Sequence, residues 1–320
     1  MNDFFPTFNF IDTFWAPWES VQDFSWNGKI VAMGFLVSLA CGLIGAFIVV
    51  RKLALMGDAI SHGILPGLAL AFIITQSKDL MPMFVGACIA GLLCSFCIEW
   101  LQKVSPLKAD AALGLTFTSF FALGVLLITQ MGNHAHIDSE CLLYGEIGFT
   151  PLAETINWGS FELGPRPLVT MALVTIGIIL TIVVFYRQLI VTSFDETLSI
   201  SLGLPIKVIH YGLMLLLAIT IVAAFESVGV ILVIAMLIFP STTASFFFSR
   251  MPSILFCVPA LSLVYSLGGF FMARWLDCSI AASMVVIAMV CFAIAWLIGP
   301  VDGVIPKILQ RKAFAYRVPS

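Results

Sequence analysis

The stretch IVAMGFLVSLACGLIGAFIVV, residues 30–50, contains no charged residue and is long enough to cross a bilayer as an α-helix. Eight further apolar runs follow it, at about 59–76, 80–101, 110–131, 167–186, 208–225, 228–248, 253–275 and 279–299. Because lipid offers backbone N–H and C=O groups no hydrogen-bond partner, each run is expected to form a helix. The sequence therefore predicts an all-α, polytopic membrane protein with about nine transmembrane helices.

The composition of the 320-residue chain supports this prediction. Hydrophobic residues make up 61% and charged residues 10%, whereas a soluble domain carries about 25% charged residues. We divide the chain into an aromatic interfacial segment at 1–28, a transmembrane domain at 29–299 and a cytoplasmic tail at 300–320. The first segment contains four acidic residues and no Lys or Arg, which argues against a cleaved signal peptide.

The basic residues predict the orientation of the bundle. If the N-terminus lies outside, 11 of the 15 Lys and Arg residues fall in the inner segments. Cytoplasmic segments of membrane proteins carry the excess of positive charge. The sequence therefore predicts an N-out, C-in topology.

Small residues recur at intervals of four in the first two spans. They are Gly34, Ser38, Gly42 and Ala46 in the first span, and Gly63, Gly67 and Ala71 in the second. Such faces allow helix backbones to approach closely in lipid, so they predict a tightly packed bundle.

Two connections between spans stand out. The segment 132–167 is the longest predicted outer connection and is acidic, which favours a functional role. The inner segment 187–207 has Phe194, Leu198 and Leu202 at helical spacing, followed by the stop signals Gly203 and Pro205. This pattern predicts a short amphipathic helix at the inner surface; the alternative is an ordinary connecting loop.

The segment MGDAISHGILPG, residues 56–67, contains the strongest candidate site. Asp58 and His62 are four residues apart, so both side chains lie on one face of a helix. A carboxylate oxygen and an imidazole nitrogen suit Mn²⁺, Fe²⁺ or Zn²⁺. Pro66 removes a helical hydrogen bond nearby. Spacing alone leaves open the alternative that Asp58 caps the helix and His62 is an interfacial residue.

Further polar residues within the spans are candidates for a metal pathway. Glu226 is predicted either to face the pathway or to occupy a short outer turn between two spans. Pro240 is followed by Ser241 and Thr242, whose hydroxyls either line the pathway or satisfy the backbone around the proline. His210, beside Lys207, is interpreted as an interfacial residue.

The acidic outer segment contains a second histidine cluster. His134 and His136, together with Asp138, could capture a metal ion outside the membrane. The alternative is a solvated polar loop, because His and Asp residues are common on exposed loops.

Several sequence motifs of enzymes are absent from the chain. It contains no G-x-x-x-x-G-K-[ST], H-E-x-x-H or G-x-S-x-G sequence, so we expect neither an ATPase site of its own nor the enzyme sites that the other two motifs mark. If ATP drives the transport, its hydrolysis must occur on a separate polypeptide.

Four segments, in this order, resemble the permease subunits of bacterial manganese, zinc and iron ABC importers, the ABC-3 family. The similarity extends over about residues 29–299. The segments are VVRKLALMGDAISHGILPG (49–67), LLYGEI (142–147), FDETLSISLGLP (194–205) and VGVILVIAMLIFPSTTAS (228–245).

The resemblance implies a type II ABC importer-like permease in the bacterial cytoplasmic (inner) membrane, without a permanently bound cofactor. Its implied partners are an ABC ATPase, a periplasmic metal-binding protein and a second permease copy or paralogue; nucleic acid is not among them. Asp58 and His62 would line the path of the transported divalent metal ion. The implied ATPase-coupling residues are Phe194, Asp195, Glu196, Leu198 and Gly203.

The alternative function is an ion-coupled secondary metal transporter. That class would require internal repeats with broken helices and metal uptake without ATP. The sequence shows no convincing repeat.

Overall fold

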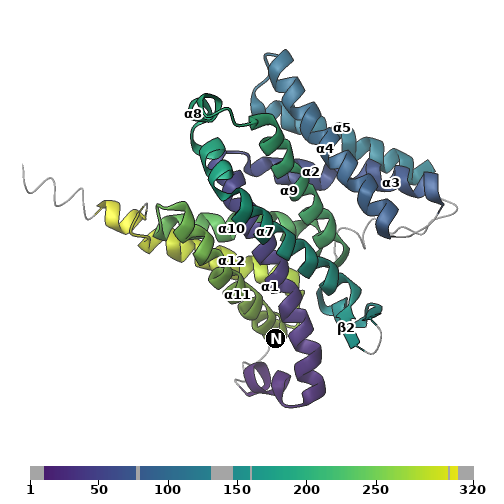
Figure 1. Ribbon diagram of the computed structural model, residues 1–320. Helices are drawn as coiled ribbons and strands as arrows, with labels where there is room; N and C mark the ends of the chain where they lie inside the picture. Colours follow the sequence, from purple (N-terminus) through teal and green to yellow (C-terminus); the bar gives the residue numbers. More distant parts are fainter. Residues whose placement is uncertain (1–10, 77–79, 131–146, 159–160, 302, 309–320) are drawn as a thin grey trace, which may run out of the picture.

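A computed structural model shows the fold and describes residues 11–76, 80–130, 147–158, 161–301 and 303–308. Within this part of the chain, eight helical stretches are long and apolar enough to cross a membrane, and a ninth, Leu232–Phe247, is shorter. The predicted polytopic bundle of about nine helices is therefore confirmed (Figure 1). The N-out, C-in orientation stays a prediction.

The membrane-crossing helices lie close to the predicted apolar runs. They are α1 (Val21–Val50), α2 and α3 (Ala54–Gly63 and Leu65–Thr75, which form one span), α4 (Leu80–Val104), α5 (Ala109–Gln130), α7 (Arg166–Phe194), α9 (Ile206–Val228), α10 (Val230–Phe247), α11 (Met251–Leu276) and α12 (Ile280–Ile298).

Two helices are longer than their apolar runs. Helix α1 begins at Val21 rather than at residue 30, because Ser20 caps it: its Oγ accepts a hydrogen bond from the N–H of Gln22 at 3.2 Å. Helix α7 continues to Phe194 rather than ending near residue 186, across a kink at Phe185, where φ is −100° and ψ is 16°. The cap thus sets the start of α1 before its apolar run, and a helical segment beyond the kink lengthens α7.

Helix α1 lies at the centre of the bundle, against α7, α10 and α11. Its small residues make this contact close: a Cβ added at Gly42 would lie 2.9 Å from both Pro240 Cβ and Val258 Cγ1. The hydroxyl of Ser38 donates a hydrogen bond to Ser262 Oγ at 3.0 Å. The predicted close-packing face of the first span is therefore confirmed.

Gly45 is the basis of a stability prediction. A Cβ at this position would collide with the backbone carbonyl oxygen of Leu237 in α10, which cannot move aside as a flexible side chain would. We expect Gly45→Ala to lower the free energy of unfolding by about 1–3 kcal/mol, the usual cost of overpacking. Thermal unfolding of the purified protein in detergent measures this change.

Gly28 in the same helix provides the matched control. A Cβ added there would meet no atom within 4 Å. Because alanine is favoured over glycine inside a helix by about 0.5–1 kcal/mol, Gly28→Ala is expected to leave stability unchanged or to raise it. Equal destabilisation by the two substitutions would contradict the packing argument.

The second span is interrupted where α2 ends and α3 begins. Pro66 has no N–H and so cannot donate to the carbonyl of His62 one turn earlier, and the two helices meet at Ile64. The predicted small-residue face packs against α4: a Cβ added at Gly63 would lie 2.7 Å from Cys94 Sγ, and one at Gly67 would meet the carbonyl of Gly86. The span thus combines a break with a close-packed face.

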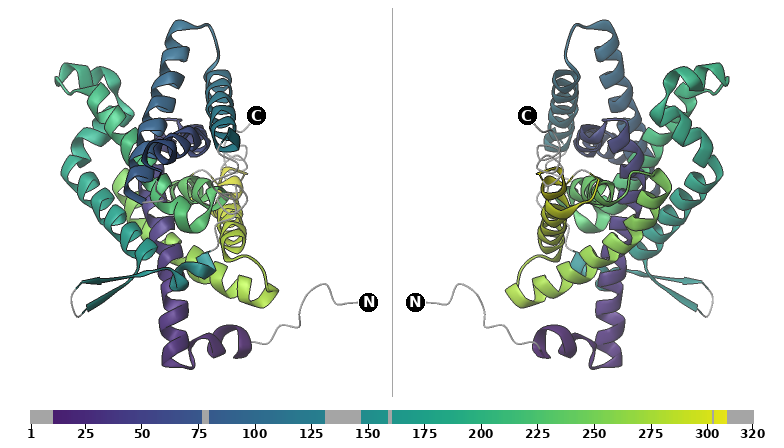
Figure 2. Two further views of the ribbon diagram at one scale, coloured as in Figure 1. Left: turned by 90° about the vertical axis from the view of Figure 1, so that its right-hand side faces the viewer. Right: turned by 90° about the vertical axis from the view of Figure 1, so that its left-hand side faces the viewer.

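Short elements outside the spans mark the two ends of the molecule. They are η1 (Ile11–Trp15), η2 (Ala16–Trp18), η3 (Ile147–Leu152), the antiparallel hairpin β1–β2 (Thr155–Trp158 and Phe161–Pro165) and α8 (Glu196–Ser201). Helix α8 lies at one end, between α7 and α9, whereas η1, η2 and the hairpin lie at the opposite end (Figures 1 and 2). The all-α prediction did not include the hairpin.

The N-terminal segment folds back onto the bundle. The rings of Phe14 and Phe271 lie 4.6 Å apart, and those of Trp18 and Phe270 lie 5.9 Å apart. Asn27 Nδ2 donates a hydrogen bond to the carbonyl of Pro17 at 2.8 Å. The described part of this segment therefore joins the ends of α1 and α11.

Candidate functional site

Asp58 and His62 lie on one face of α2, as their spacing predicts. His62 Nε2 and Asp58 Oδ1 are 3.5 Å apart. The imidazole also lies beside two rings of α5, with ring centroids 5.8 Å from Phe117 and 5.7 Å from Phe121. A neighbouring carboxylate and two aromatic rings thus restrict the orientation of the imidazole.

The rest of α2 anchors this pair in the bundle. Between Met56 and Gly63, every residue except Asp58 and His62 is buried. Gly57 packs against the side chain of Leu237 in α10. From Met56 to Gly63, α2 therefore buries its apolar and small residues and leaves the two ionisable side chains partly accessible.

The pair supplies two ligands of a cation site. The described residues hold no group of three or more His, Cys, Asp or Glu side chains that could bind a metal ion. Divalent transition metals take four to six ligands. Further ligands would therefore come from water, from backbone carbonyls, from residues outside the described ranges or from another polypeptide.

The other pathway candidates lie on α9 and α10. Glu226 falls within the last turn of α9 rather than in a connecting turn. Ser241 is buried and donates to the carbonyl of Ile238 at 3.1 Å, beside Pro240. Thr242 is half-buried, and its carbonyl accepts from the hydroxyl of Ser245 at 2.7 Å. The Ser241 hydroxyl thus satisfies backbone around the proline, and its role in a pathway stays a prediction.

The outer capture candidates His134, His136 and Asp138 lie outside the described residues. Of the acidic outer segment 132–167, the structure describes residues 147–158 and 161–167. This part forms η3 and the hairpin.

The predicted surface helix forms, but it is shorter and begins later than expected. Phe194 is the last residue of α7, and Asp195 then caps α8 by accepting from the N–H of Leu198 at 2.9 Å. Glu196 is the first residue of α8, and Gly203 adopts a φ of +69° where the chain turns toward α9. Phe194 and Leu198 are exposed at this end of the molecule.

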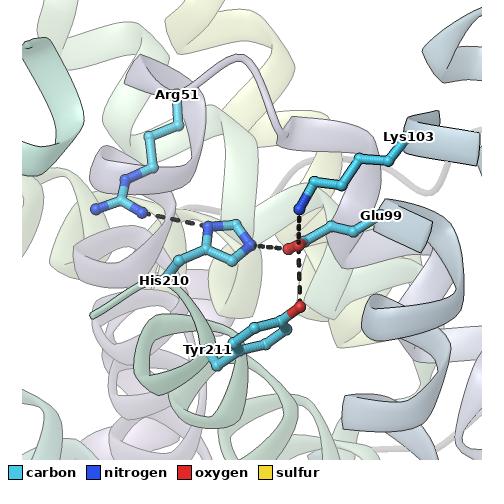
Figure 3. Close-up of polar contacts among 5 residues, drawn as sticks. All are labelled: Arg51, Glu99, Lys103, His210 and Tyr211. Atoms are coloured by element: carbon cyan, nitrogen blue, oxygen red, sulfur yellow. Dashed lines mark hydrogen bonds and ion pairs between the residues drawn. The ribbon is translucent and has the colours of Figure 1, made fainter. Parts of the chain in front are cut away.

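A second polar group near α8 is centred on Glu99 of α4. We call Arg51, Glu99, Lys103, His210 and Tyr211 the Glu99 cluster (Figure 3). Tyr211 Oη donates to Glu99 Oε2 at 3.0 Å, and Lys103 Nζ lies 3.6 Å from the same oxygen. His210 Nε2 contacts the other carboxylate oxygen.

The sequence interpretation of His210 as an interfacial residue was incomplete. Its imidazole is mostly buried and lies between Glu99 and the guanidinium of Arg51. The distance from His210 Nδ1 to Arg51 Nη1 is 3.5 Å. One sequence signal pointed to this group: Glu99 is a carboxylate within an apolar run, and such residues are costly unless they have partners.

A bundle of apolar helices with an ionisable pair on a broken span and a short amphipathic helix at one end defines a polytopic membrane permease. The chain belongs to the ABC 3 transport family, whose family model matches residues 26–299. The family resemblance seen in the sequence is therefore confirmed.

Known proteins similar to this chain cover almost its whole length. The manganese transport system membrane protein MntD of Bacillus subtilis is 40% identical over 286 residues, which are 89% of this chain and 96% of MntD. The zinc transport system membrane protein TroD of Treponema pallidum is 39% identical over 285 residues, which are 89% of this chain and 77% of TroD.

A solved structure is also similar. PsaBC from Streptococcus pneumoniae, in complex with a Fab, matches with a TM-score of 0.75 at 33% identity. The match covers 91% of this chain and 97% of the other chain.

Proposed function

We propose that this chain is the membrane-spanning permease subunit of an ATP-driven importer of divalent transition-metal ions. The observation that carries the proposal is the Asp58–His62 pair, whose oxygen and nitrogen lie 3.5 Å apart and whose side chains are partly exposed within the otherwise buried stretch 56–63. Membership of the ABC 3 transport family supports the coupling to ATP. The names of the manganese and zinc transport relatives support the class of cargo.

A second permease copy or paralogue would complete the site. In a two-fold symmetric dimer, the same face of each subunit meets its equivalent. Two Asp58–His62 pairs would then provide two oxygens and two nitrogens around one ion. This donor set suits Mn²⁺, Zn²⁺ and Fe²⁺, and it would replace part of the hydration shell during transport.

The two ends of the molecule would bind different partners. The segment 194–205, which contains α8, would dock on a separate ABC ATPase. The acidic outer segment 132–167, whose described hairpin lies at the opposite end, would face a periplasmic metal-binding protein. ATP-driven closure of the ATPase would open one end of the pathway and close the other, so that the ion has access to each side in turn.

We place the protein in the bacterial cytoplasmic (inner) membrane with its N-terminus outside and its C-terminus inside. The distribution of Lys and Arg supports this orientation. Three of the basic residues, Arg51, Lys103 and Lys207, line one cavity near α8, which agrees with α8 lying at the inner surface.

Cys278 provides a direct test of the orientation. It is exposed in the connection between α11 and α12, which the proposed topology places outside, whereas the other described cysteines are buried or partly buried. We expect a membrane-impermeant maleimide added to intact spheroplasts to label Cys278 in a Cys141→Ser background. Mass spectrometry of the labelled peptide identifies the site.

The matched control introduces a cysteine at the end that carries α8. Lys108→Cys, in the exposed connection between α4 and α5, is expected to react only after the membrane is permeabilised. Labelling of residue 108 but not residue 278 in intact spheroplasts would reverse the proposed topology.

Reconstitution tests the proposed function itself. The permease is assembled in proteoliposomes with an ABC ATPase and a metal-binding protein from the same organism, and uptake of ⁵⁴Mn²⁺, ⁶⁵Zn²⁺ and ⁵⁵Fe²⁺ is measured. We expect uptake that requires ATP hydrolysis and persists without an ion gradient. Uptake driven by a proton or sodium gradient without ATP would instead establish the alternative, an ion-coupled secondary transporter.

A further inference from the structure

The Glu99 cluster connects four parts of the chain that are distant in sequence. Glu99 and Lys103 belong to α4, and His210 and Tyr211 belong to α9. Arg51 is the residue that follows α1. Its guanidinium reaches α7 as well, so a single group of side chains ties together the ends of α1, α4, α7 and α9.

Arg51 connects the cluster to residues that precede α8. Arg51 Nε donates to Ser193 Oγ at 3.0 Å, and Nη2 donates to Thr192 Oγ1 at 2.9 Å. These two residues stand just before the 194–205 segment, and His210 stands just after it. The flank before the segment is therefore hydrogen-bonded to the guanidinium of Arg51. The flank after the segment carries His210, whose imidazole contacts the same guanidinium.

The same cluster is connected to the metal-site helix. Only Lys52 and Leu53 separate Arg51 from the start of α2 at Ala54. Leu53 and Met56 line a cavity of about 620 Å³ together with Glu99 and His210. A displacement of the cluster would therefore act on α2 both through the chain and through this shared cavity.

The charges of the cluster make it a poor cation site. Glu99 and His210 alone could bind a metal ion, but Arg51 Nη1 lies 3.5 Å from the imidazole and Lys103 Nζ lies 3.6 Å from the carboxylate. These two cations repel a third one. Hydrogen-bonded charges of this kind fix the relative position of the helices that carry them.

We propose that the Glu99 cluster transmits movement of the 194–205 segment to α2, with Arg51, Glu99 and His210 as positioning residues. The inference rests on the proposed function, in which this segment docks on the ATPase. When the ATPase moves α8, the flanks of the segment pull on Arg51 and His210. The cavity beside the cluster gives the side chains room to exchange partners, and α2 moves with them.

The test measures how many metal ions enter per ATP hydrolysed by the complete transporter in proteoliposomes, with ⁵⁴Mn²⁺ as the probe. In Glu99→Gln, the ATPase is expected to remain bound and to hydrolyse ATP at the basal rate of the wild type. Because coupling between sites is typically worth about 5–150-fold, we expect uptake per ATP to fall by about tenfold. Lys207→Ala, an exposed residue lining the same cavity, should keep the wild-type ratio.

Two further variants separate positioning from folding. Arg51→Lys keeps the charge but loses the planar guanidinium, whose three nitrogens contact Ser193, Thr192 and His210 at the same time. It should therefore also lower uptake per ATP. The exchange of Glu99→His with His210→Glu restores the paired contact and should recover most of the ratio.

Two results would overturn the inference. One is a wild-type uptake-to-ATP ratio in both Glu99→Gln and Arg51→Lys. The other is a loss of uptake that is proportional to a loss of ATPase binding and of thermal stability, and that the double substitution Glu99→His with His210→Glu does not reverse. If the wild-type transporter itself takes up none of the three metals with ATP, the proposed function fails instead.

Discussion

Replacing Asp58 or His62 by alanine is expected to abolish metal accumulation while the protein still inserts into the membrane at the wild-type level. The two side chains are the partly accessible residues of α2 between positions 56 and 63, so their loss keeps the buried contacts of that helix, and His62→Ala loses only the ring contacts with α5. Loss of residues that only support metal ligands costs about 10–100-fold in affinity or activity. Loss of a ligand should therefore lower the rate of uptake by at least about 100-fold.

Uptake of ⁵⁴Mn²⁺ and ⁶⁵Zn²⁺ by cells carrying each variant measures the effect, with membrane abundance followed by immunoblotting. The control is Asp110→Ala, which removes an exposed carboxylate from the first turn of α5 and should leave uptake unchanged. Wild-type uptake by both Asp58→Ala and His62→Ala would remove these residues from the metal path.

The second large effect is expected at α8. Leu198 is 47% exposed on this six-residue helix, and the proposed function places it against the ATPase. A glutamate at the centre of a protein interface buries an unpaired charge, which costs several kcal/mol. We expect Leu198→Glu to abolish co-purification of the ATPase with the permease, and ATP-driven uptake with it.

Leu107→Glu is the matched control. Leu107 is 39% exposed in the connection between α4 and α5, outside the 194–205 segment. The substitution introduces the same charge in place of the same side chain and should preserve both ATPase binding and uptake. If Leu198→Glu binds the ATPase as the wild type does, the 194–205 segment is not the docking element.

The spans could be predicted because bilayer thickness sets a minimum apolar length, which runs such as 30–50 satisfy on their own. Helix α8 was also predictable, since Leu198 and Leu202 recur at helical spacing before Gly203. Its first residue could not be predicted because a cap depends on side-chain geometry: the carboxylate of Asp195 accepts from the N–H of Leu198 and so separates α8 from α7.

The Asp58–His62 pair was accessible to sequence reasoning because its spacing is local to one helix. The Glu99 cluster was not, because its members come together only through packing. Arg51 and His210 are 159 positions apart, and Tyr211 and Glu99 are 112 apart. Only the carboxylate within the apolar run signalled that Glu99 needed partners, and the sequence does not show which ones.

The apolar surface around α8 has a consequence for how the cell balances its subunits. Phe194, Leu198, Ile200 and Leu202 are exposed, at the end of the molecule that the proposed topology turns toward the cytoplasm. Clustered apolar side chains of this kind promote aggregation when they stay uncovered. If the proposed ATPase covers this surface, a permease made in excess of it would keep the surface exposed, so co-expression of the ATPase should raise the yield of the permease.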